Sequence, residues 1–577
     1  MRANSPPHAV RTTCSPLTRH LALALSLLST VCAAAETVPN AGGLLQTVPT
    51  QPRQSSTPAA PALPTIRPDP PAAMPETTAF LVRQLRVDGN TVFDTATLQA
   101  LLASMLDQRL TLPQIAQGIE AITTYYREAG YPLARTIIPA QTIENGVVRV
   151  HVVEASWGQV ELRNNSAVSD TVLLRALSNL EPGSVIRLDA MERATLLLSD
   201  LPGLVPRALL RAGQEVGTSD LVLDTQPGAP WSAALSADNF GSRYTGVGRT
   251  NANVQWNNPL GQGDTLGLSS VTSESGGLNY ARLAYEVPVL MAGMQAGVDN
   301  SGMQYRLGDN AGSLMASGKA DTSSAWLRSA LVRSPNTNLN ARLSWTNNVL
   351  QDHVDSTGVQ TDRSVNVWSL ELSGERQDDF LGGGKNTLGF ALYSGQVTFD
   401  DETAGALDAN TAQTAGGFGR ATWALSRTQA LGTSVSAVLN MNGQWAQKNL
   451  DNGQKFSVGG ATSVRAYRSG LLSGDSGASG SFELRYTLPT SQALEQTGTW
   501  QLAAFIDGAT VQTNQSPWSS GSNEASISSA GLGLNWQGPK GASLRMFIAS
   551  SMGELPSQLA GSESTHTNAW WELSWAF

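Results

Sequence analysis

From about residue 229 to the C terminus, the chain consists of short segments in which apolar and polar residues alternate. In one of them Trp368, Leu370 and Leu372 share one face, and serine and glutamate residues occupy the other. A period of two residues is typical of a β-strand with one apolar and one polar face. We count about sixteen such segments in the 349 residues of this region (577 − 228). At about 22 residues for a strand and its connection, they suit tilted membrane-crossing strands of roughly 9–11 residues.

A soluble β-sandwich also alternates, but three features favour a transmembrane barrel. Thirteen of the fourteen tryptophans lie in this region, as expected for aromatic girdles at two membrane interfaces. An even number of strands closes the sheet and leaves no edge. The chain also ends on an alternating segment whose apolar face we interpret as a barrel-assembly signal. That face consists of Trp571, Leu573, Trp575 and Phe577.

A helix is predicted within residues 111–132, in a region of mixed α/β pattern that extends from 80 to 228. The segment has a proline near its start and ends in a glycine and a second proline. Its apolar residues recur at spacings of four, three and four, as on one face of a helix. These residues are Ile115, Ile119, Ile122 and Tyr126.

Strand-like segments lie on both sides of this helix. The strand before it is expected to place three apolar residues on one face: Leu81, Leu85 and Val87. A similar order of strands and helices follows once more along the chain. We therefore predict two small α/β modules, at residues 80–155 and 156–228, each of about 75 residues.

The first 79 residues have the pattern of an export signal followed by a linker. Arginines precede the apolar run LALALSLLSTVCAAA, which predicts a signal peptide at residues 1–35. The run of about 15 apolar residues is too short for a membrane-spanning anchor. Residues 36–79 are rich in proline and are expected to form a linker. The piece AGGLLQTV within this linker is a candidate for a short plug helix.

Cysteine and charge narrow the chemistry of the mature chain. Both cysteines, Cys14 and Cys32, lie in the predicted signal peptide, so we expect no disulfide and no thiol chemistry. Val31 is larger than the residue that usually precedes a lipid-modified cysteine, so we do not expect Cys32 to carry a lipid. Cleavage removes three arginines and no acidic residue, which leaves 34 basic and 46 acidic residues and a net charge of −12. Such a charge argues against nucleic-acid binding.

We find no enzyme motif, and we expect no cofactor and no metal. The three histidines of the mature chain are scattered and lack metal-ligand spacing. The sequence contains no G-x-S-x-G elbow and no Walker-type phosphate loop.

The order of these regions resembles the two-partner secretion transporters of the outer membrane, the TpsB-type haemolysin activator/secretion family. The segment LRVDGNTVF and residues 110–155 are similar to the family's first polypeptide-transport-associated (POTRA) domain. The segments ADNFGSRYTGVGR and NNPLGQGDTL are similar to its first barrel hairpin. The resemblance implies a sixteen-stranded antiparallel barrel in the cell outer membrane, with two POTRA-like modules in the periplasm.

The resemblance also assigns the stretch GGATSVRAYRSG, residues 459–470, to a particular loop of the family's barrel. The family carries a Val-Arg-Gly-Tyr tip on a long extracellular loop that folds back into the barrel. The matching residues here are Val464, Arg465, Ala466 and Tyr467. We expect their loop at about 447–479, between the eleventh and twelfth strands. The family's F-x-D-x-G motif on the facing wall is matched by Phe505 and Asp507.

Alternation places Asp507 on the same strand face as Phe505, so that it can point into the lumen and bind Arg465 in a bidentate pair. A lipid-facing arginine at the midplane would cost ~2–4 kcal/mol. Ala466 and Ala509 stand where the family has glycine, so either both keep ordinary dihedral angles or the tip docks differently. The alternative for Arg465 is a solvated loop cation.

The resemblance implies export of one large secreted partner without nucleotide, and the partner is an adhesin, a cytolysin or a toxin. Periplasmic modules would recognise its unfolded chain, while barrel-assembly machinery and outer-membrane lipid are partners of the barrel itself. Three alternatives remain open. An insertase of the same superfamily usually has more periplasmic modules, a simple porin has no POTRA-like module, and a secreted all-β adhesin would be soluble without detergent.

Overall fold

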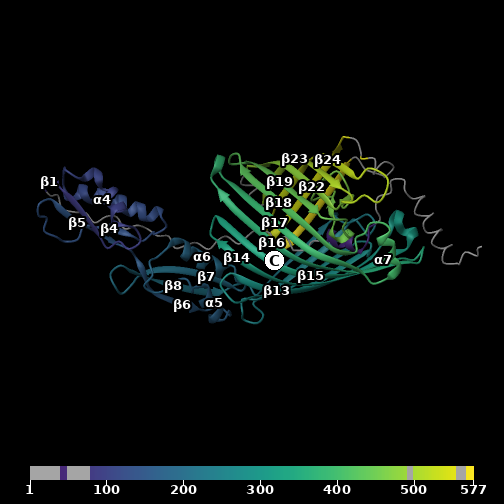
Figure 1. The fold of residues 1–577 in the computed structure, drawn as a ribbon, viewed down its shortest axis with the longest axis horizontal. Helices are drawn as coiled ribbons and strands as arrows, with labels where there is room; N and C mark the ends of the chain where they lie inside the picture. Colours follow the sequence, from purple (N-terminus) through teal and green to yellow (C-terminus); the bar gives the residue numbers. More distant parts are fainter. Residues whose placement is uncertain (1–38, 49–77, 490–497, 554–555, 557–566) are drawn as a thin grey trace, which may run out of the picture.

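The computed structural model describes residues 39–48, 78–489, 498–553, 556 and 567–577. The predicted signal peptide and most of the predicted linker lie outside the described residues. Two α/β modules stand at one end of a large barrel (Figure 1). In the described ranges, no helix is long and apolar enough to cross a membrane.

The first module packs two helices against a small sheet. Its elements are β1 (Phe80–Val82), β2 (Gln84–Asp88), α3 (Thr95–Ala100), β3 (Gln108–Leu110), α4 (Leu112–Glu128), β4 (Arg135–Ile137) and β5 (Val147–Val153). A capping box between Thr111 and Gln114 begins α4. The four predicted core residues of α4 are buried, so its apolar face is confirmed. The sheet has the order β2-β5-β4, and β2 runs parallel to β5.

The chain from β1 to β2 departs from the single predicted strand. β1 pairs with β3, whereas β2 pairs with β5, so the two strands belong to different sheets. Leu85 and Val87 are buried, but Val82 is buried in place of Leu81, which is 37% exposed. The prediction for Leu81 is wrong because alternation carries across a segment only while the strand is unbroken.

The second module sits directly on the barrel. It contains β6 (Ser156–Asn164), α5 (Asp170–Ala176), α6 (Leu188–Ser199), β7 (Leu204–Ala212) and β8 (Thr218–Pro227), with the sheet order β6-β8-β7. Strand β7 was not predicted from the sequence. Arg333 of the barrel donates to both carboxylate oxygens of Asp200, each at 2.8 Å. Arg193 Nη2 donates to the Ala330 carbonyl at 2.8 Å, which ties α6 to the barrel rim.

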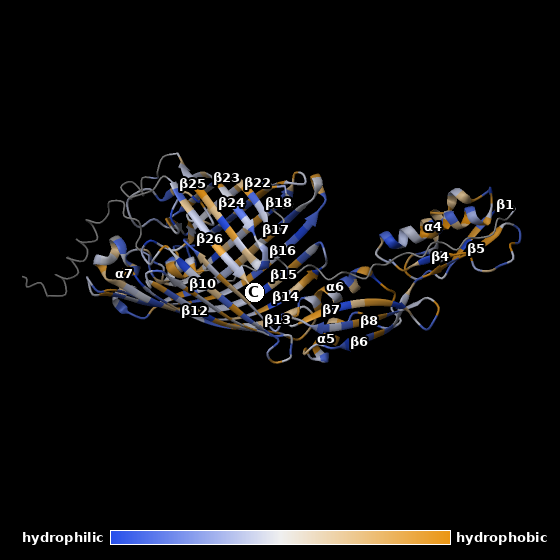
Figure 2. Ribbon diagram, turned by 180° about the vertical axis from the view of Figure 1, so that it is seen from behind, coloured by the Kyte–Doolittle hydropathy of each residue, from blue (hydrophilic) through white to orange (hydrophobic). Residues whose placement is uncertain are grey.

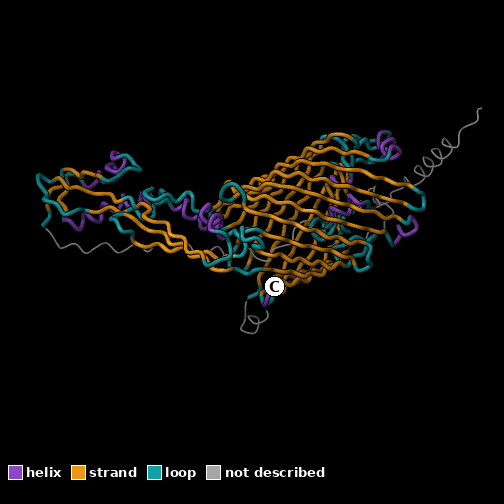
Figure 3. The backbone as a smooth tube through the Cα atoms, turned by 90° about the horizontal axis from the view of Figure 1, so that it is seen from below, coloured by secondary structure: helices purple, strands orange, loops and turns teal. Residues whose placement is uncertain are grey.

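Sixteen antiparallel strands form a closed barrel, which confirms the predicted fold class. They are β9 (Trp231–Asp238), β10 (Arg249–Asn257), β11 (Thr265–Ser273), β12 (Leu278–Pro288), β13 (Met294–Arg306), β14 (Ala316–Arg333), β15 (Thr337–Val354), β16 (Val359–Asp378), β17 (Gly384–Phe399), β18 (Gly416–Ala430), β19 (Val435–Ala446), β22 (Ser476–Thr487), β23 (Thr499–Gln512), β24 (Glu524–Gln537), β25 (Ala542–Met552) and β26 (Thr567–Ala576). Strand β26 pairs with β9 and closes the sheet. The strands run obliquely around the wall (Figure 3).

The two faces of the barrel wall differ in polarity, as the alternating colours along the strands show (Figure 2). Trp368 and Leu370 point outward and are 56% and 50% exposed, as the alternation predicted. The prediction that the tryptophans form membrane girdles is only partly correct. Trp570 is 5% exposed and faces the lumen, and Trp326 lies inward beneath the guanidinium of Arg342, 4.6 Å from its ring centroid.

Short helices complete the described fold. One α-helix, α7 (Glu402–Ala409), lies between β17 and β18 at the end of the barrel away from the modules (Figure 1). Four 3-10 helices of the described residues connect strands or helices: η1 (Ala103–Met105), η2 (Asp309–Leu314), η3 (Phe380–Gly382) and η5 (Pro539–Gly541).

Candidate functional site in the barrel lumen

Two segments from distant parts of the chain lie inside the barrel. One is loop 6, our name for residues 447–475 between β19 and β22, and the other is helix α2 (Ala41–Thr47). Loop 6 contains η4 (Asn452–Gln454), β20 (Phe456–Val458) and β21 (Leu472–Gly474), and β20 pairs with β21. The loop ends at 475 rather than at the predicted 479, because residues 476–479 already pair with the neighbouring strands as part of β22.

The tip of loop 6 places Arg465 against Asp507 on β23. The Nε and Nη2 atoms of Arg465 donate to the two carboxylate oxygens at 3.0 and 2.7 Å, and the Arg465 main-chain N–H donates at 3.1 Å. Arg465 and Asp507 are 5% and 4% exposed. Ser529 on β24 donates a further hydrogen bond to Asp507 at 3.0 Å. The structure thus brings together the arginine and the carboxylate that the sequence analysis paired.

A second carboxylate, missed in the sequence analysis, completes the arginine's partners. Arg465 Nη1 lies 3.0 Å from Glu483 Oε2 on β22, and Glu483 also accepts from Arg485 Nε at 2.7 Å. Glu483 and Arg485 alternate along β22 with the exposed, outward-facing residues Phe482, Leu484 and Tyr486, and so lie on the lumen face. However, alternation gives only the face, and the loop fold decides which lumen residue meets Arg465.

Aromatic rings cover the remaining faces of the guanidinium. The Arg465 Cζ atom lies 3.2 Å from the ring centroid of Phe505 and 5.1 Å from that of Phe547. Phe505 and Phe547 meet edge to face, with centroids 6.0 Å apart. Cation–π attraction strengthens when water is excluded. The family motif residue Phe505 therefore shields the ion pair that the motif aspartate makes.

The main chain of the tip is also bound to the wall. The carbonyls of Arg465 and Ala466 accept hydrogen bonds from Trp570 Nε1 and Asn568 Nδ2 on β26, each at 2.6 Å. Val464, Ala466 and Tyr467 are buried. Ala466 and Ala509 have no positive φ, so both residues keep the ordinary dihedral angles that an alanine adopts readily. The tip therefore docks without a glycine at either position.

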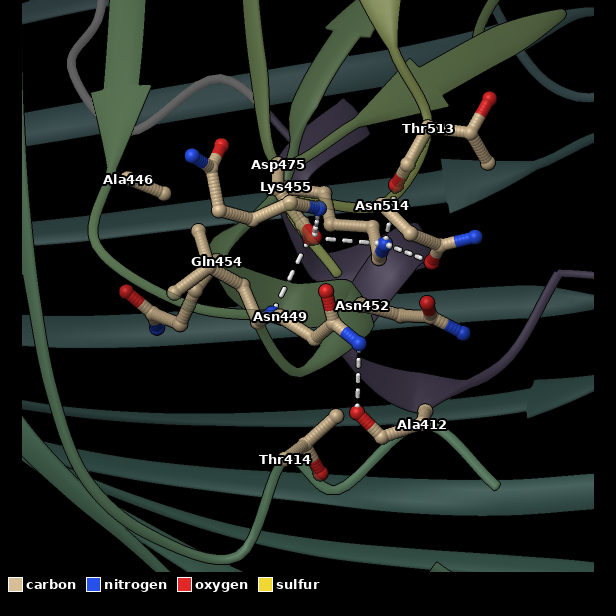
Figure 4. A network of polar contacts seen from close by, with 12 residues as sticks. Ala412, Thr414, Ala446, Asn449, Asn452, Gln454, Lys455, Asp475, Thr513 and Asn514 are labelled. Carbon is tan, nitrogen blue, oxygen red and sulfur yellow. Dashed lines mark hydrogen bonds and ion pairs between the residues drawn. The ribbon is translucent and has the colours of Figure 1, made fainter. Parts of the chain in front are cut away.

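The base of loop 6 is fastened by a second polar network (Figure 4). Asp475 is fully buried and lies 2.8 Å from Lys455 Nζ, and it accepts from the main chain of Leu450 at 3.0 Å. Asn449 donates to the carbonyls of Ala412 and Ser516, in two neighbouring loops, both at 2.8 Å. These contacts join the three loops at the end of the barrel where α7 lies.

Helix α2 packs into an apolar patch on the inner wall. Ala41, Leu44 and Val48 are at most 4% exposed and belong to a cluster with residues of β11 to β19. The backbones of Gly42 and Gly453 touch, because a Cβ added to Gly42 would lie 2.7 Å from the Gly453 nitrogen. Gln46 donates to two carbonyls of loop 6, at 3.3 and 3.0 Å. The helix therefore rests on loop 6 as well as on the wall.

A buried charge bridge connects α2 with loop 6. The Ala41 main-chain N–H donates to Asp352 at 2.7 Å. Arg363, which is 2% exposed, lies 2.7 Å from Asp352 and 2.5 Å from Asp451 of loop 6. Because each buried charge has a partner, the bridge avoids the desolvation cost of a lone ion.

The other end of α2 is held near the seam of the barrel. The Thr47 carbonyl accepts from Arg249 Nη1 at 2.9 Å. The same arginine forms an ion pair with Asp238, at the end of β9, at 2.9 Å. Both ends of this short helix thus contact charged residues of the wall.

The predicted C-terminal signal residues lie away from this site, on the outer face of the barrel. They are Trp571, Leu573, Trp575 and Phe577, and they are 40–66% exposed. The rings of the last two stack with centroids 6.3 Å apart. Trp570, the residue directly before them, points inward to loop 6.

The fold and the filled lumen define a transporter of the outer membrane with periplasmic modules. Residues 217–536, more than half of the chain, match the family described as haemolysin secretion/activation protein ShlB/FhaC/HecB. Residues 80–155 match the POTRA domain of ShlB type. The chain belongs to the ShlB/FhaC/HecB family, so the predicted family, outer-membrane location and secretion function are confirmed.

Individual relatives agree with this assignment. The chain is 27% identical over 455 residues to the heme/hemopexin transporter protein HuxB of Haemophilus influenzae (strain 86-028NP), a match that covers 78% of this chain and 80% of that protein. It is 24% identical over 474 residues to the outer membrane transporter CdiB of Escherichia coli O6:K15:H31 (strain 536 / UPEC), covering 78% and 76%.

A solved structure supports the fold. CdiB from Escherichia coli matches with a TM-score of 0.69 at 21% identity, over 98% of this chain and 100% of that chain. These comparisons favour the transporter over the insertase alternative. The family consists of transporters that work with a secreted partner protein.

Proposed function

We propose that loop 6 and α2 together close the resting pore, and that the Arg465 network keeps the loop in the lumen during transport. The observation that supports this most directly is the burial of Arg465 between two carboxylates on neighbouring wall strands. Removing one partner of a buried ion pair typically costs ~3–5 kcal/mol. Such a cost is enough to hold the tip at one place on the wall.

The periplasmic modules would capture the unfolded partner by adding its extended chain to a sheet edge. Strands β2 and β4 are the edges of the first module's sheet, and β6 and β7 are the edges of the second. Main-chain hydrogen bonds to such an edge tolerate varied sequences. The partner would be a large exported adhesin, cytolysin or toxin, and its folding outside the cell would drive export without nucleotide.

Outer-membrane lipid and the barrel-assembly machinery would be the partners of the barrel during its insertion. The exposed apolar side chains on β26 support this role for the C-terminal segment, because they are presented outward on the last strand. The assembly machinery would bind this strand before the strand pairs with β9.

Single-channel conductance in planar bilayers tests the closure. Deletion of residues 40–48 is expected to raise the resting conductance severalfold, and Arg465→Ala in the same background to raise it further. An unchanged conductance in the double variant would refute closure by these segments.

Deletion of residues 80–155 tests capture of the partner separately. It is expected to abolish partner secretion while porin assembly continues, and lost porin assembly would contradict a role dedicated to secretion.

A further inference from the structure

The barrel wall differs in height around its circumference. Strands β14, β15 and β16 contain 18, 18 and 20 residues, whereas β9, β10 and β26 at the closing seam contain 8, 9 and 10. A tilted strand needs roughly 9–11 residues to cross a membrane. The long strands continue past this span toward the α7 end, opposite the periplasmic modules (Figure 1).

The outward-facing residues of the long strands change from apolar to polar at a defined point. Trp345 and Trp368 are Cα partners on neighbouring strands, and tryptophan is typical of a membrane interface. The next outward positions toward the α7 end are Asn347 and Asn366, which are also Cα partners. The continuous apolar surface therefore ends at the tryptophans, and the outward positions beyond them on these strands are polar except for Val349.

These asparagines belong to a continuous line of polar residues, which we call the amide row. It consists of successive Cα partners on β13 to β17: Asn300, Ser323, Asn347, Asn366 and Gln396. Asn300 Nδ2 donates to Ser323 Oγ at 2.9 Å. On β9, by contrast, Leu235 remains outward and 49% exposed within a strand that ends at residue 238.

A shallow groove lies beyond the amide row on the same outer face. It has a volume of about 440 Å³ and is lined by polar side chains that include Arg306, Lys319 and Gln351. Asp321 faces outward between Lys319 and the amide row, which limits the net positive charge of this surface. Hydrogen bonding by amides and hydroxyls, rather than charge, is therefore the main chemistry that this surface offers.

We propose that this outer surface binds the phosphorylated saccharide headgroups of the glycolipid in the outer leaflet of the outer membrane. Amide side chains both donate and accept hydrogen bonds, and so do sugar hydroxyls. Arg306 and Lys319 would bind the phosphates. Nine residues of β15 and nine of β16 lie beyond the tryptophans. They rise about 23 Å at 3.3 Å per residue and a tilt near 40°. This height fits a layer of sugars, not acyl chains. The proposal rests on the outer-membrane location, independently of pore closure.

Native mass spectrometry of the purified transporter with added lipopolysaccharide tests this proposal. Combined Asn300→Leu, Asn347→Leu and Asn366→Leu substitutions are expected to weaken binding at least fivefold, and alanine at the same positions to act in the same direction. Lumen-facing Asn340→Leu and Asn440→Leu are the matched controls. Heat-modifiable electrophoretic mobility verifies that each barrel is folded.

Two further probes separate the contributing groups. Lipid A without core sugars should bind more weakly than core-bearing lipopolysaccharide, and Arg306→Gln with Lys319→Gln should reduce binding about twofold and lower its salt dependence. Equal binding by the amide-row variants and the wild type would overturn the proposal, as would equal binding of lipid A and lipopolysaccharide. Either result would mean that this wall simply faces water or recognises phosphate alone.

Discussion

Loop 6 and helix α2 occupy the same lumen but are held there in different ways. The loop is covalently attached to the wall at both ends, and its tip is fixed by the ion pairs of Arg465 and by rings on β23 and β25. Helix α2 has seven residues, two of them glycine, and is held by an apolar cluster, a backbone contact and charges at its ends. An isolated helix of this length is unstable in water.

This difference suggests that the two lumen inserts, loop 6 and α2, have different roles in closing the pore. Because α2 is stable only while docked, undocking it also unfolds it, and its attachment is the easier one to reverse. Loop 6 loses buried charge pairs when it leaves, so it is the more permanent insert.

Arg465→Ala should have the largest effect because it leaves Asp507 buried without a cation. We expect the docked tip to lose ~3–5 kcal/mol and partner secretion to fall at least tenfold while the barrel remains inserted. Immunoblotting of the culture medium and hydrogen exchange of loop 6 measure the two effects. Arg468→Ala, three residues away and without an ion pair among the described residues, is the charge-matched control. Normal secretion by Arg465→Ala would show that the two inserts do not differ as described.

Arg363→Met should loosen both inserts at once, since it leaves Asp352 and Asp451 facing each other without their shared cation. We expect a loss of ~3–5 kcal/mol in the docking of α2 and faster exchange at η4. Adding Asp352→Asn and Asp451→Asn removes the unpaired charges and should restore most of the protection. If the single and triple variants behave alike, charge does not couple the helix to the loop.

Gly42→Ala should affect α2 alone. The added Cβ would lie 2.7 Å from the Gly453 backbone nitrogen, so the helix must move away from loop 6. Gly43→Ala is the control, because its Cβ would meet only the Asn40 side chain at 3.5 Å. We expect a severalfold higher resting conductance for Gly42→Ala only, with secretion preserved. Equal conductances of the two variants would contradict a gating contact at Gly42.

Glu154→Gln should have the smallest effect, because it changes the first module and touches neither insert. Partial burial raises the pKa of Glu154, but hydrogen bonds from Thr91, Tyr126 and the backbone of Val92 outweigh it and lower the pKa below 4.5. A lowered pKa stabilises the folded module above pH 4.5, and this stability is lost as the pH falls through the folded pKa. The variant should lose this acid dependence in hydrogen exchange of residues 80–155, with an unchanged pore conductance.

The sequence alone determined much of the architecture, because alternation is a local property. The period of two along the C-terminal region predicted sixteen strands and the face of Asp507, and the helical spacing in the first module predicted its buried residues. The family motif then identified Arg465 as the partner of Asp507. Local signals also failed where a strand was interrupted, as at Leu81, or where a residue's place depended on another segment, as at Trp570.

The contacts between residues across the lumen could not be predicted from local pattern. Glu483, Phe547 and Trp570 come from three strands, and no spacing along the chain indicates that they surround one arginine. The position of α2 likewise depends on a wall patch and a glycine contact more than 400 residues away in sequence, at Gly453. The physical reason is that strand pattern fixes which face a residue occupies, whereas barrel register and loop folding fix its neighbours.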